Sequence, residues 1–524
     1  MTLRALLAAA SGLSLAACST LATTPVPDSP DGPPPARNLA PVAASHEGQG
    51  ADWRALADAE LNQRLNRPER EGRARNVILF IVDGLNVPTI TAARILEGQL
   101  RGETGEENYL PFETWGHSAL IKTYNENAQV PDSAGTATAM LAGVKSHIGA
   151  ISVYARQTVD GCGPDADVPM TTYEAAEARG LSTGIVSTAR ITHATPAAAY
   201  AHLPSRDWEV DAVVPADAAA AGCTDIASQL IGTLDGRYGD GPEVVLGGGY
   251  GAFLTADQGG QRQDGRDLTA EWVEAGGAYV DDAAGFRALP VDGSRALGLF
   301  SRSHMAYDHD RVDAEEPSIE EMTRFAIERL STNENGYFLL VEGGRVDHAH
   351  HGTNAHRALT DALAAARAVA AAAEMTDPDE TLILVTADHG HVFNIAGYPR
   401  RGNPILGLVH PPAPDLSDAP TPPSPARDGR PYTTLGYYNG PTLRDPDGGP
   451  LTQEQVLDPD YRQEAGVPMG SETHSGEDII AYARGPWAHL VDGTMEQHTL
   501  NRIITFAYGW PGNTAPDTEA GAED

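Results

Sequence analysis

Short apolar runs alternate with amphipathic stretches along most of the chain. The run Asn76–Val82 (NVILFIV) is apolar after its first residue and ends at Asp83-Gly84, which is typical of a strand buried on both faces of a parallel sheet. Similar runs stand at residues 182–187, 243–246, 337–341 and 381–385, and helical periodicity marks residues 318–330 and 355–374. This alternation predicts an α/β fold with a doubly wound, mostly parallel central sheet flanked by helices.

Polar side chains follow several of these runs. Asp83, Thr188, Glu342 and Asp388 stand directly past predicted strand ends. A single carboxylate after a strand is more often a cap or a turn residue, so only their joint occurrence is informative. Because ligands of open α/β sheets bind at the carboxyl ends of the strands, we expect these four side chains to converge.

The segments outside the alternating region differ in composition. Residues 19–50 are rich in proline, which favours extended backbone, whereas residues 51–68 have apolar positions near helical spacing. Residues 394–469 are rich in proline and glycine and are interpreted as a surface insertion. The predicted organisation is a signal peptide with lipobox (1–18), a tether (19–50), an N-terminal helix (51–68), an α/β domain (75–393 and 470–512), the insertion (394–469) and an acidic tail (513–524).

The first eighteen residues read as a secretion signal. They carry one early arginine, an apolar run too short to span a bilayer, and small residues before Cys18. The stretch Leu15-Ala16-Ala17-Cys18 resembles the bacterial lipobox, in which the cysteine is acylated, while ordinary signal cleavage is the alternative. Ser19 follows instead of an aspartate, which favours the outer membrane. We therefore expect an exported protein, either periplasmic or an outer-membrane-anchored lipoprotein.

Two further cysteines, Cys162 and Cys223, remain for the folded part of the chain. In an oxidising compartment such a pair tends to bridge, so we predict a disulfide between them. Two free buried thiols are the alternative reading.

The charge balance excludes one class of partner. Lys+Arg number 36 against 72 Asp+Glu, which gives a formal charge of −36, and the lysines are Lys122 and Lys145 alone. A protein that binds nucleic acid needs clustered positive charge, so nucleic acid is not expected as a structural partner. The hydrophobic share of 41% is enough for a large core and excludes wholesale disorder.

Carboxylates and histidines cluster where strands are expected to end. Asp347 and His351 are four residues apart and share one face of a helical turn, a donor pair that suits zinc. Asp388 and His389 are adjacent and follow a strand, and His474 and Asp83 can complete two sets of about three ligands. Three protein ligands leave open positions for substrate, which is typical of catalytic metal sites.

Ser133 follows Asp132 and precedes small residues, so it is expected near the positive end of a helix, where a phosphate is also favoured. The plain alternative is a serine that caps the helix. No G-x-S-x-G elbow is present, so a serine-hydrolase triad has no local support. A metal can instead lower the pKa of this hydroxyl and generate the nucleophile.

Four motifs together carry a resemblance to a known family. They are PDSAGTATA around Ser133, VEGGRVDHAHH at Val341–His351, TADH at Thr386–His389 and ETHSGED at Glu472–Asp478. With them the sequence, from about Asn76 to Trp510, resembles the alkaline phosphatases, and within them the eukaryotic-type branch. The resemblance implies phosphate monoesters as substrates, a homodimer, two zinc ions and one magnesium ion per chain, and a crown-like role for residues 394–469.

The resemblance also implies a role for each matching residue. Ser133 becomes the phosphorylated nucleophile and Arg206 grips the phosphate, with Asp132, His193, His348 and His391 around the substrate and the metal ligands. The implied ligands are Asp347, His351 and His474 for one zinc, Asp83, Asp388, His389 and Ser133 for the other, and Asp83, Thr195 and Glu342 for magnesium. A calcium site with Asp217, the Phe300 carbonyl and Glu316 is possible, although Ser301 stands where an acidic ligand is expected. Gly84-Leu85-Asn86 departs from the usual G-M-G and is expected to alter helix packing.

Phosphate monoester hydrolysis through a phosphoserine is the first interpretation. A phosphodiesterase or a sulfatase of the same superfamily is the alternative among enzymes, and a non-catalytic surface lipoprotein that binds phosphate or metal is the alternative outside them. The residues after Ser133 do not fit the sulfatase motif, and Thr195 with Glu342 speaks against a diesterase. In a non-catalytic protein we expect some of the metal ligands to be missing, whereas this sequence has a residue at each ligand position that the resemblance implies.

Overall fold

The computed structural model describes residues 53–159, 162–163, 166–415, 417 and 419–514. The predicted signal peptide, the lipobox with Cys18 and the tether lie outside these residues, as does the predicted tail from residue 515. Among the described residues, no helix is both long enough and apolar enough to cross a membrane.

The chain divides into an N-terminal unit that ends at Arg67 and a second unit that begins at Pro68. The first unit contains helix α1 (Trp53–Leu65), within the segment predicted to be helical. The second unit holds the sheets and all the residues with predicted site roles from Asp83 onwards.

A ten-stranded sheet forms the centre of the second unit, in the order β15-β2-β14-β8-β1-β7-β3-β4-β6-β5. From β8 to β5 all neighbours are parallel, and β14 runs antiparallel to both β8 and β2. The mostly parallel sheet confirms the predicted fold class. Its strands are β1 (Asn76–Ile81), β2 (His117–Lys122), β3 (Ser182–Arg190), β4 (Val244–Gly248), β5 (Ala278–Val280), β6 (Ala296–Leu299), β7 (Tyr337–Glu342), β8 (Thr381–Thr386), β14 (Ile479–Arg484) and β15 (Thr494–Glu496).

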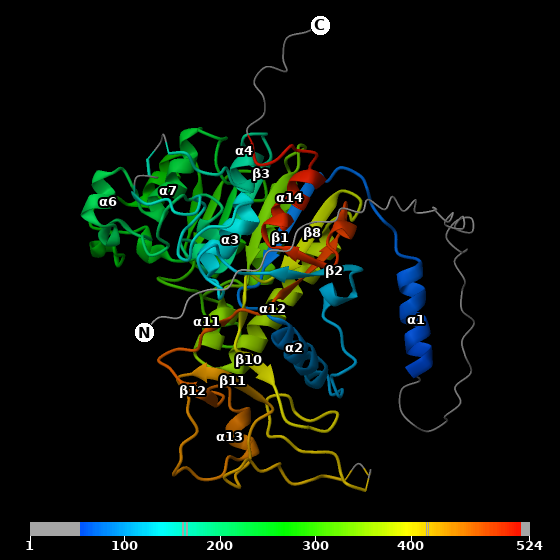
Figure 1. Cartoon of the computed structure of the whole chain (residues 1–524). Helices are drawn as coiled ribbons and strands as arrows, with labels where there is room; N and C mark the ends of the chain where they lie inside the picture. Colours follow the sequence, from blue (N-terminus) through cyan, green and yellow to red (C-terminus); the bar gives the residue numbers. More distant parts are fainter. Residues whose placement is uncertain (1–52, 160–161, 164–165, 416, 418, 515–524) are drawn as a thin grey trace, which may run out of the picture. The chain divides into compact units, whose positions relative to one another are not determined.

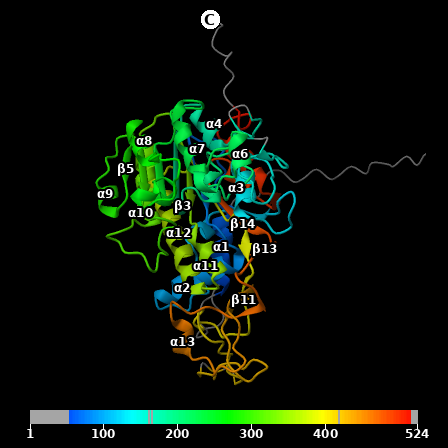
Figure 2. The same cartoon turned by 90° about the vertical axis from the view of Figure 1, so that its left-hand side faces the viewer.

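Helices cover both faces of this sheet (Figures 1 and 2). α2, α10, α11 and α12 pack with one another on one face, and α3, α4, α5 and α14 lie on the other. The helices are α2 (Val87–Leu100), α3 (Ser133–Ala142), α4 (Thr172–Glu177), α5 (Ala194–Ala197), α6 (Ala216–Ala220), α7 (Ile226–Gly232), α8 (Leu268–Glu274), α9 (Ala283–Arg287), α10 (Ile319–Leu330), α11 (Arg345–His351), α12 (Ala355–Met375), α13 (Gln453–Leu457) and α14 (His498–Ala507).

Asn86, where the sequence departs from the usual G-M-G, is the N-cap residue of helix α2. Its side-chain oxygen accepts hydrogen bonds from the backbone N–H and the hydroxyl of Thr89, at 3.2 and 2.7 Å, which caps the helix. The Asn86 amide also donates to the carbonyl of His391 at 2.9 Å. Asn86 therefore joins the start of α2 to the segment that follows β8, in line with the expected effect on helix packing.

One strand end was placed wrongly from the sequence. Strand β3 continues to Arg190, so Thr188 lies within it, beyond a register shift after Val186. The Thr188 hydroxyl accepts a hydrogen bond from the backbone N–H of Gly344 at 2.9 Å. Thr188 thus holds the loop before α11 through this hydrogen bond. The strand end was misplaced because irregular pairing with β4 extends β3 past its apolar run.

Residues 394–469 extend from one end of the second unit (Figure 1). They contribute most of a small sheet of β10 (Phe393–Ile395), β11 (Leu435–Gly440) and β12 (Ala465–Pro468), and they include helix α13. Strand β9 (Gly390–His391) precedes this small sheet in the sequence and β13 (His474–Ser475) follows it. The two form a two-stranded sheet in which His474 pairs with His391. After the insertion the chain thus returns to β9 at His474 and enters the main sheet again at β14.

The predicted disulfide is confirmed. Cys162 and Cys223 are bonded, with their Cα atoms 4.8 Å apart. Such a bridge restricts the unfolded chain across the 61-residue separation of the two cysteines. Its presence is consistent with export to an oxidising compartment.

Candidate active site

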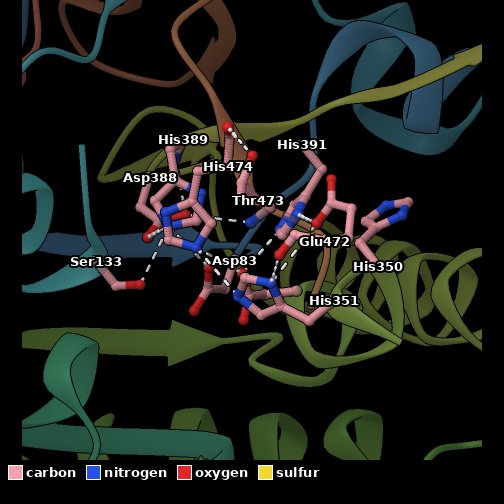
Figure 3. A network of polar contacts seen from close by, with 12 residues as sticks. Asp83, Ser133, His350, His351, Asp388, His389, His391, Glu472, Thr473 and His474 are labelled. Atoms are coloured by element: carbon pink, nitrogen blue, oxygen red, sulfur yellow. Dashed lines mark hydrogen bonds and ion pairs between the residues drawn. The ribbon is translucent and has the colours of Figure 1, made fainter. Parts of the chain in front are cut away.

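The polar residues that follow the central strands meet at the carboxyl edge of the sheet. Asp83 follows β1, Glu342 ends β7 and Asp388 follows β8, and all three are fully buried. Figure 3 shows Asp83 and Asp388 beside Ser133 and the histidines of β9 and β13. The expected convergence of these carboxylates is therefore present.

Asp347, His351 and His474 form the first donor group. Helix α11 places Asp347 and His351 one turn apart, with Oδ1 and Nε2 separated by 3.3 Å. Nε2 of His474 is 3.2 Å from Nε2 of His351 and 3.3 Å from Oδ1 of Asp347. A tetrahedral ion with bonds of about 2.0–2.1 Å requires ligand atoms about 3.3–3.4 Å apart. The triangle therefore has the dimensions of one face of a zinc site.

Asp83, Asp388 and His389 form the second donor group. Nε2 of His389 is 3.1 Å from Oδ2 of Asp388 and 3.6 Å from Oδ1 of Asp83. The ring of His389 stacks on that of His474 with centroids 3.6 Å apart, so the two groups are immediate neighbours. This proximity suits a pair of metal ions that act on one substrate.

A third group shares Asp83 with the second. Asp83, His193 and Glu342 can hold one ion together, and the hydroxyl of Ser187 donates to Glu342. The Thr195 hydroxyl, on α5, is buried and has no hydrogen-bond partner within the described part of the chain. His193 was predicted to lie around the ligands; its distance to Asp83 and Glu342 is also short enough for it to be a ligand, and its role stays a prediction. His193 is the N-cap residue of α5, and its carbonyl accepts a hydrogen bond from the backbone N–H of Ala197 at 2.9 Å. The sequence around His193 did not predict this short helix.

Unpaired buried atoms show that these groups fit cations. Among the described residues, both carboxylate oxygens of Asp83 and one of Glu342 have no hydrogen-bond partner. Burial and the neighbouring carboxylates raise the pKa of Asp83 well above its usual value, and burial raises that of Glu342 to about 7. Such buried acids are costly unless positive charge accompanies them, and divalent cations supply it.

Ser133 occupies the first turn of α3 and faces the second group. The helix is capped by Asp132, whose side chain accepts from the backbone N–H of Gly135 at 3.2 Å. Ser133 is therefore not the capping residue, which removes the plain alternative. Its Oγ lies 3.1 Å from Nε2 of His389 (Figure 3). The hydroxyl thus stands at the positive end of a helix and next to the metal-binding side chains.

Arg206 contacts Asp132, the residue directly before Ser133. Its guanidinium donates to Oδ2 of Asp132 at 3.1 Å and contacts Nε2 of His193 at 3.0 Å. Asn125 donates to the other oxygen of Asp132 at 3.1 Å, so the carboxylate that holds the arginine is itself held. The planar fork of Arg206 is thereby oriented for an oxyanion near Ser133.

His391 lies between two carboxylates. Its Nε2 is 2.7 Å from Oδ1 of Asp347, and its Nδ1 is 2.6 Å from Oε2 of Glu472. Burial lowers the pKa of His391, but the two carboxylates outweigh it and raise this pKa to about 10. Both ring nitrogens thus contact carboxylates, and His391 orients Asp347. Its place around the ligands stays a prediction.

Three side chains near the site were missed by sequence reasoning. Glu472 belongs to the ETH motif, but its contacts with His391 and with the Val392 backbone N–H could not be read from it. Ser187 precedes the predicted polar residue Thr188 by one position. His304 lies in a loop without periodicity, and its ring is 4.0 Å from that of His348, between centroids. His348 is half-buried, and its ring centroid lies 5.3 Å from that of His193.

The possible calcium ligands receive no geometric support. Asp217 is exposed on α6, whereas Glu316 precedes α10 and accepts a hydrogen bond from the backbone N–H of Ala306 at 2.8 Å. The groups of described acidic and histidine residues that can share an ion include neither of them. The site at Asp217, Phe300 and Glu316 stays a prediction.

The fold and this site define a metal-dependent phosphoryl-transfer hydrolase, with a serine hydroxyl, an arginine and three neighbouring donor groups at the carboxyl edge of an α/β sheet. The sequence profile described as "Alkaline phosphatase" matches residues 74–509. The chain belongs to the alkaline phosphatase family, and it hydrolyses phosphate monoesters.

Curated relatives support this assignment over most of the chain. The tissue-nonspecific isozyme of alkaline phosphatase from Gallus gallus is 43% identical over 479 residues, which cover 87% of this chain and 88% of that protein. An alkaline phosphatase from Gadus morhua is 41% identical over 478 residues, with 87% of this chain and 96% of that protein covered. The predicted likeness to the eukaryotic-type branch is thereby confirmed.

Solved structures share the fold. The alkaline phosphatase of Thermus thermophilus superposes with a TM-score of 0.60 at 24% identity, and covers 85% of this chain and 94% of its own. A mutant of the TAB5 alkaline phosphatase has a TM-score of 0.58 at 20% identity, with 84% and 99% covered.

Proposed function

We propose that Ser133 is the nucleophile of monoester hydrolysis and is phosphorylated in each turnover. The position of its Oγ, 3.1 Å from His389 and at the start of α3, carries this proposal. Ser133 Oγ bonds to phosphorus as the ester P–O bond breaks and the alcohol leaves. Water then attacks phosphorus, restores the serine hydroxyl and releases inorganic phosphate. Bound metal ions would lower the pKa of the hydroxyl and offset the charge on the phosphoryl group.

We infer two zinc ions and one magnesium ion per chain. The first group offers two histidines and one carboxylate, and the second offers one histidine and two carboxylates. Zinc accepts both kinds of donor set. The third group offers oxygens of Asp83, Thr195 and Glu342, which suit the harder magnesium ion. Burial lowers the pKa of His389 well below its usual value, so this imidazole is neutral and can ligate a metal.

Replacement of Arg206 by lysine should weaken substrate binding and transition-state stabilisation together. Lysine keeps the charge but cannot offer two parallel N–H groups to two phosphate oxygens, and it loses the paired contact with Asp132. We expect kcat/KM for a chromogenic monoester to fall by about 30- to 100-fold. Arg302→Lys is the control, since Arg302 donates to the Gly259 carbonyl away from the site. An unchanged kcat/KM in Arg206→Lys would refute the assigned role.

A phosphodiesterase is the second candidate among enzymes. The third donor group argues against it, because Glu342 and Thr195 add a further cation site beside Asp83. A chromogenic monoester and its diester counterpart, assayed with and without chelator, separate the two. Diester turnover equal to or greater than monoester turnover would reject the first function, and activity that resists the chelator would reject metal dependence.

We also propose that the chain is exported, acylated at Cys18 and assembled as a homodimer, with residues 394–469 shaping substrate preference. The disulfide between Cys162 and Cys223 supports export, and the lipobox supports acylation.

Metabolic labelling with a fatty-acid analogue should mark the full chain and fail to mark Cys18→Ser. The label is expected because a lipobox cysteine carries the acyl chains, and electrophoresis of the purified protein detects it. The loss of label in Cys18→Ser should be complete, since the disulfide occupies both remaining cysteines. Equal labelling of both proteins would contradict acylation at this residue.

A further inference from the structure

A second pocket lies at the amino-terminal ends of the central strands. Its volume is about 430 Å³, and it is lined by three arginines, Arg73, Arg75 and Arg179, together with Tyr508 and Trp510. None of these residues takes part in the catalytic site described above.

This pocket is remote from the catalytic residues. Its lining residues Arg75 and Leu181 directly precede β1 and β3, and Asn335 precedes β7, whereas Asp83 and Glu342 stand at the opposite ends of those parallel strands. Six residues of strand span about 20 Å. Figure 1 shows α4 and α14, which lead into the pocket, at the end of the sheet away from α11. One phosphoryl group cannot occupy both sites.

Few carboxylates of the described residues pair with the arginines of this pocket. Arg73 is exposed and makes no ion pair with any described residue, and the pairing of Arg75 with Glu380 is loose, at 3.8 Å between Nη1 and Oε2. Arg179 uses Nη1 for the carbonyls of Ala175 and Thr514, which leaves its other donors available. Three arginines that line one pocket, with Glu380 as the one described carboxylate paired with them, stand out in a chain of net charge −36.

The aromatic wall of the pocket holds an unsatisfied donor. Trp510 is only 6% exposed, and its indole N–H has no hydrogen-bond partner among the described residues. The ring stacks on Tyr508, with centroids 4.2 Å apart, and the guanidinium carbon of Arg179 lies 4.5 Å from the ring centre. A buried donor without an acceptor is costly, and an acceptor oxygen from a ligand would remove that cost.

We propose that this pocket binds a phosphate group. Guanidinium groups present paired N–H donors that match the oxygens of a phosphate, and the chain has no lysine there to act as a simple point charge. Two sources supply this chemistry: the inorganic phosphate that the chain's own reaction releases, and the headgroup of an anionic phospholipid. Binding of released inorganic phosphate presupposes the hydrolysis of monoesters, whereas binding of a phospholipid headgroup does not.

The first experiment titrates the full-length holoenzyme with inorganic phosphate by calorimetry. We expect a binding event beyond that of the active site, weakened about tenfold or more in Arg73→Glu. Arg427→Glu is the matched control, since Arg427 is exposed, makes no ion pair with a described residue and changes the net charge equally. Inhibition of monoester hydrolysis by phosphate reports the active site and should be the same in all three proteins, which separates this proposal from the catalytic one.

The second experiment measures binding of the same proteins to vesicles of phosphatidylglycerol and of phosphatidylcholine. An acyl anchor contributes to both, so the ratio of the two affinities isolates the headgroup. A ratio that falls in Arg73→Glu but not in Arg427→Glu identifies the phospholipid as the source. If neither phosphate nor phosphatidylglycerol binding depends on Arg73, or if Arg427→Glu has an equal effect, the proposal is wrong.

Discussion

Replacement of Ser133 by alanine is expected to abolish the phosphoenzyme and to lower kcat/KM for a phosphate monoester by about a thousandfold or more. The Ser133 hydroxyl lies 3.1 Å from Nε2 of His389, a member of the second donor group, and its oxygen can bond to phosphorus. Alanine removes the attacking oxygen but keeps the helix, because Asp132 caps α3 and Ser133 does not. Acid quenching with labelled phosphate and steady-state kinetics measure the two losses.

A matched control separates this effect from general damage. Ser146 is also buried, and its hydroxyl has no hydrogen-bond partner among the described residues. Ser146→Ala should therefore retain activity and labelling. Both variants should keep the metal content of the parent protein. If Ser133→Ala still incorporates phosphate, another residue is the nucleophile and the proposed role fails.

The second large effect is expected from Asp83→Ala. Asp83 belongs to two donor groups, and its two oxygens have no hydrogen-bond partner among the described residues. Its loss should empty the magnesium site and weaken the adjacent zinc site, while the triangle of Asp347, His351 and His474 keeps its ion. We expect a loss of more than one metal ion per chain and a fall in kcat/KM of about a thousandfold or more.

Asp361→Asn is the control for this variant. Asp361 is also buried, on α12, and burial raises its pKa to about 8, but it lies outside the three donor groups. The amide can still accept the hydrogen bond from the Asp308 backbone N–H. This variant should retain all its metals. Loss of a single ion from Asp83→Ala, with the other two at full occupancy, would show that Asp83 is not shared.

The strands and the helical donor pair could be predicted because their signals are local. Asn76–Val82 is apolar at every position after Asn76, and the structure has β1 there from Asn76 to Ile81. The spacing of Asp347 and His351 fixes their common face on any helical turn, and α11 realises it. The position of Ser133 at a helix start followed from the small residues after it.

Other features depend on contacts between distant segments. The antiparallel pairing of β2 with β14 was not predicted. Strand β2 (HSALIK) is buried at only some of its positions, so its sequence carries no continuous apolar run. The pairing of His474 with His391 across 83 residues brings the last ligand to the site, and no local pattern encodes it. The link from His391 to Glu472 and the place of His193 beside Asp83 are likewise results of packing. The family resemblance supplied the ligand sets that local physics could not.

Elemental analysis of the purified holoenzyme, alongside its activity, tests the central claim most directly. The three donor groups gathered around Ser133 predict two zinc ions and one magnesium ion per chain, with activity that falls as zinc is withdrawn and returns when it is restored. Full monoesterase activity in a preparation with less than one equivalent of divalent metal per chain would contradict the account.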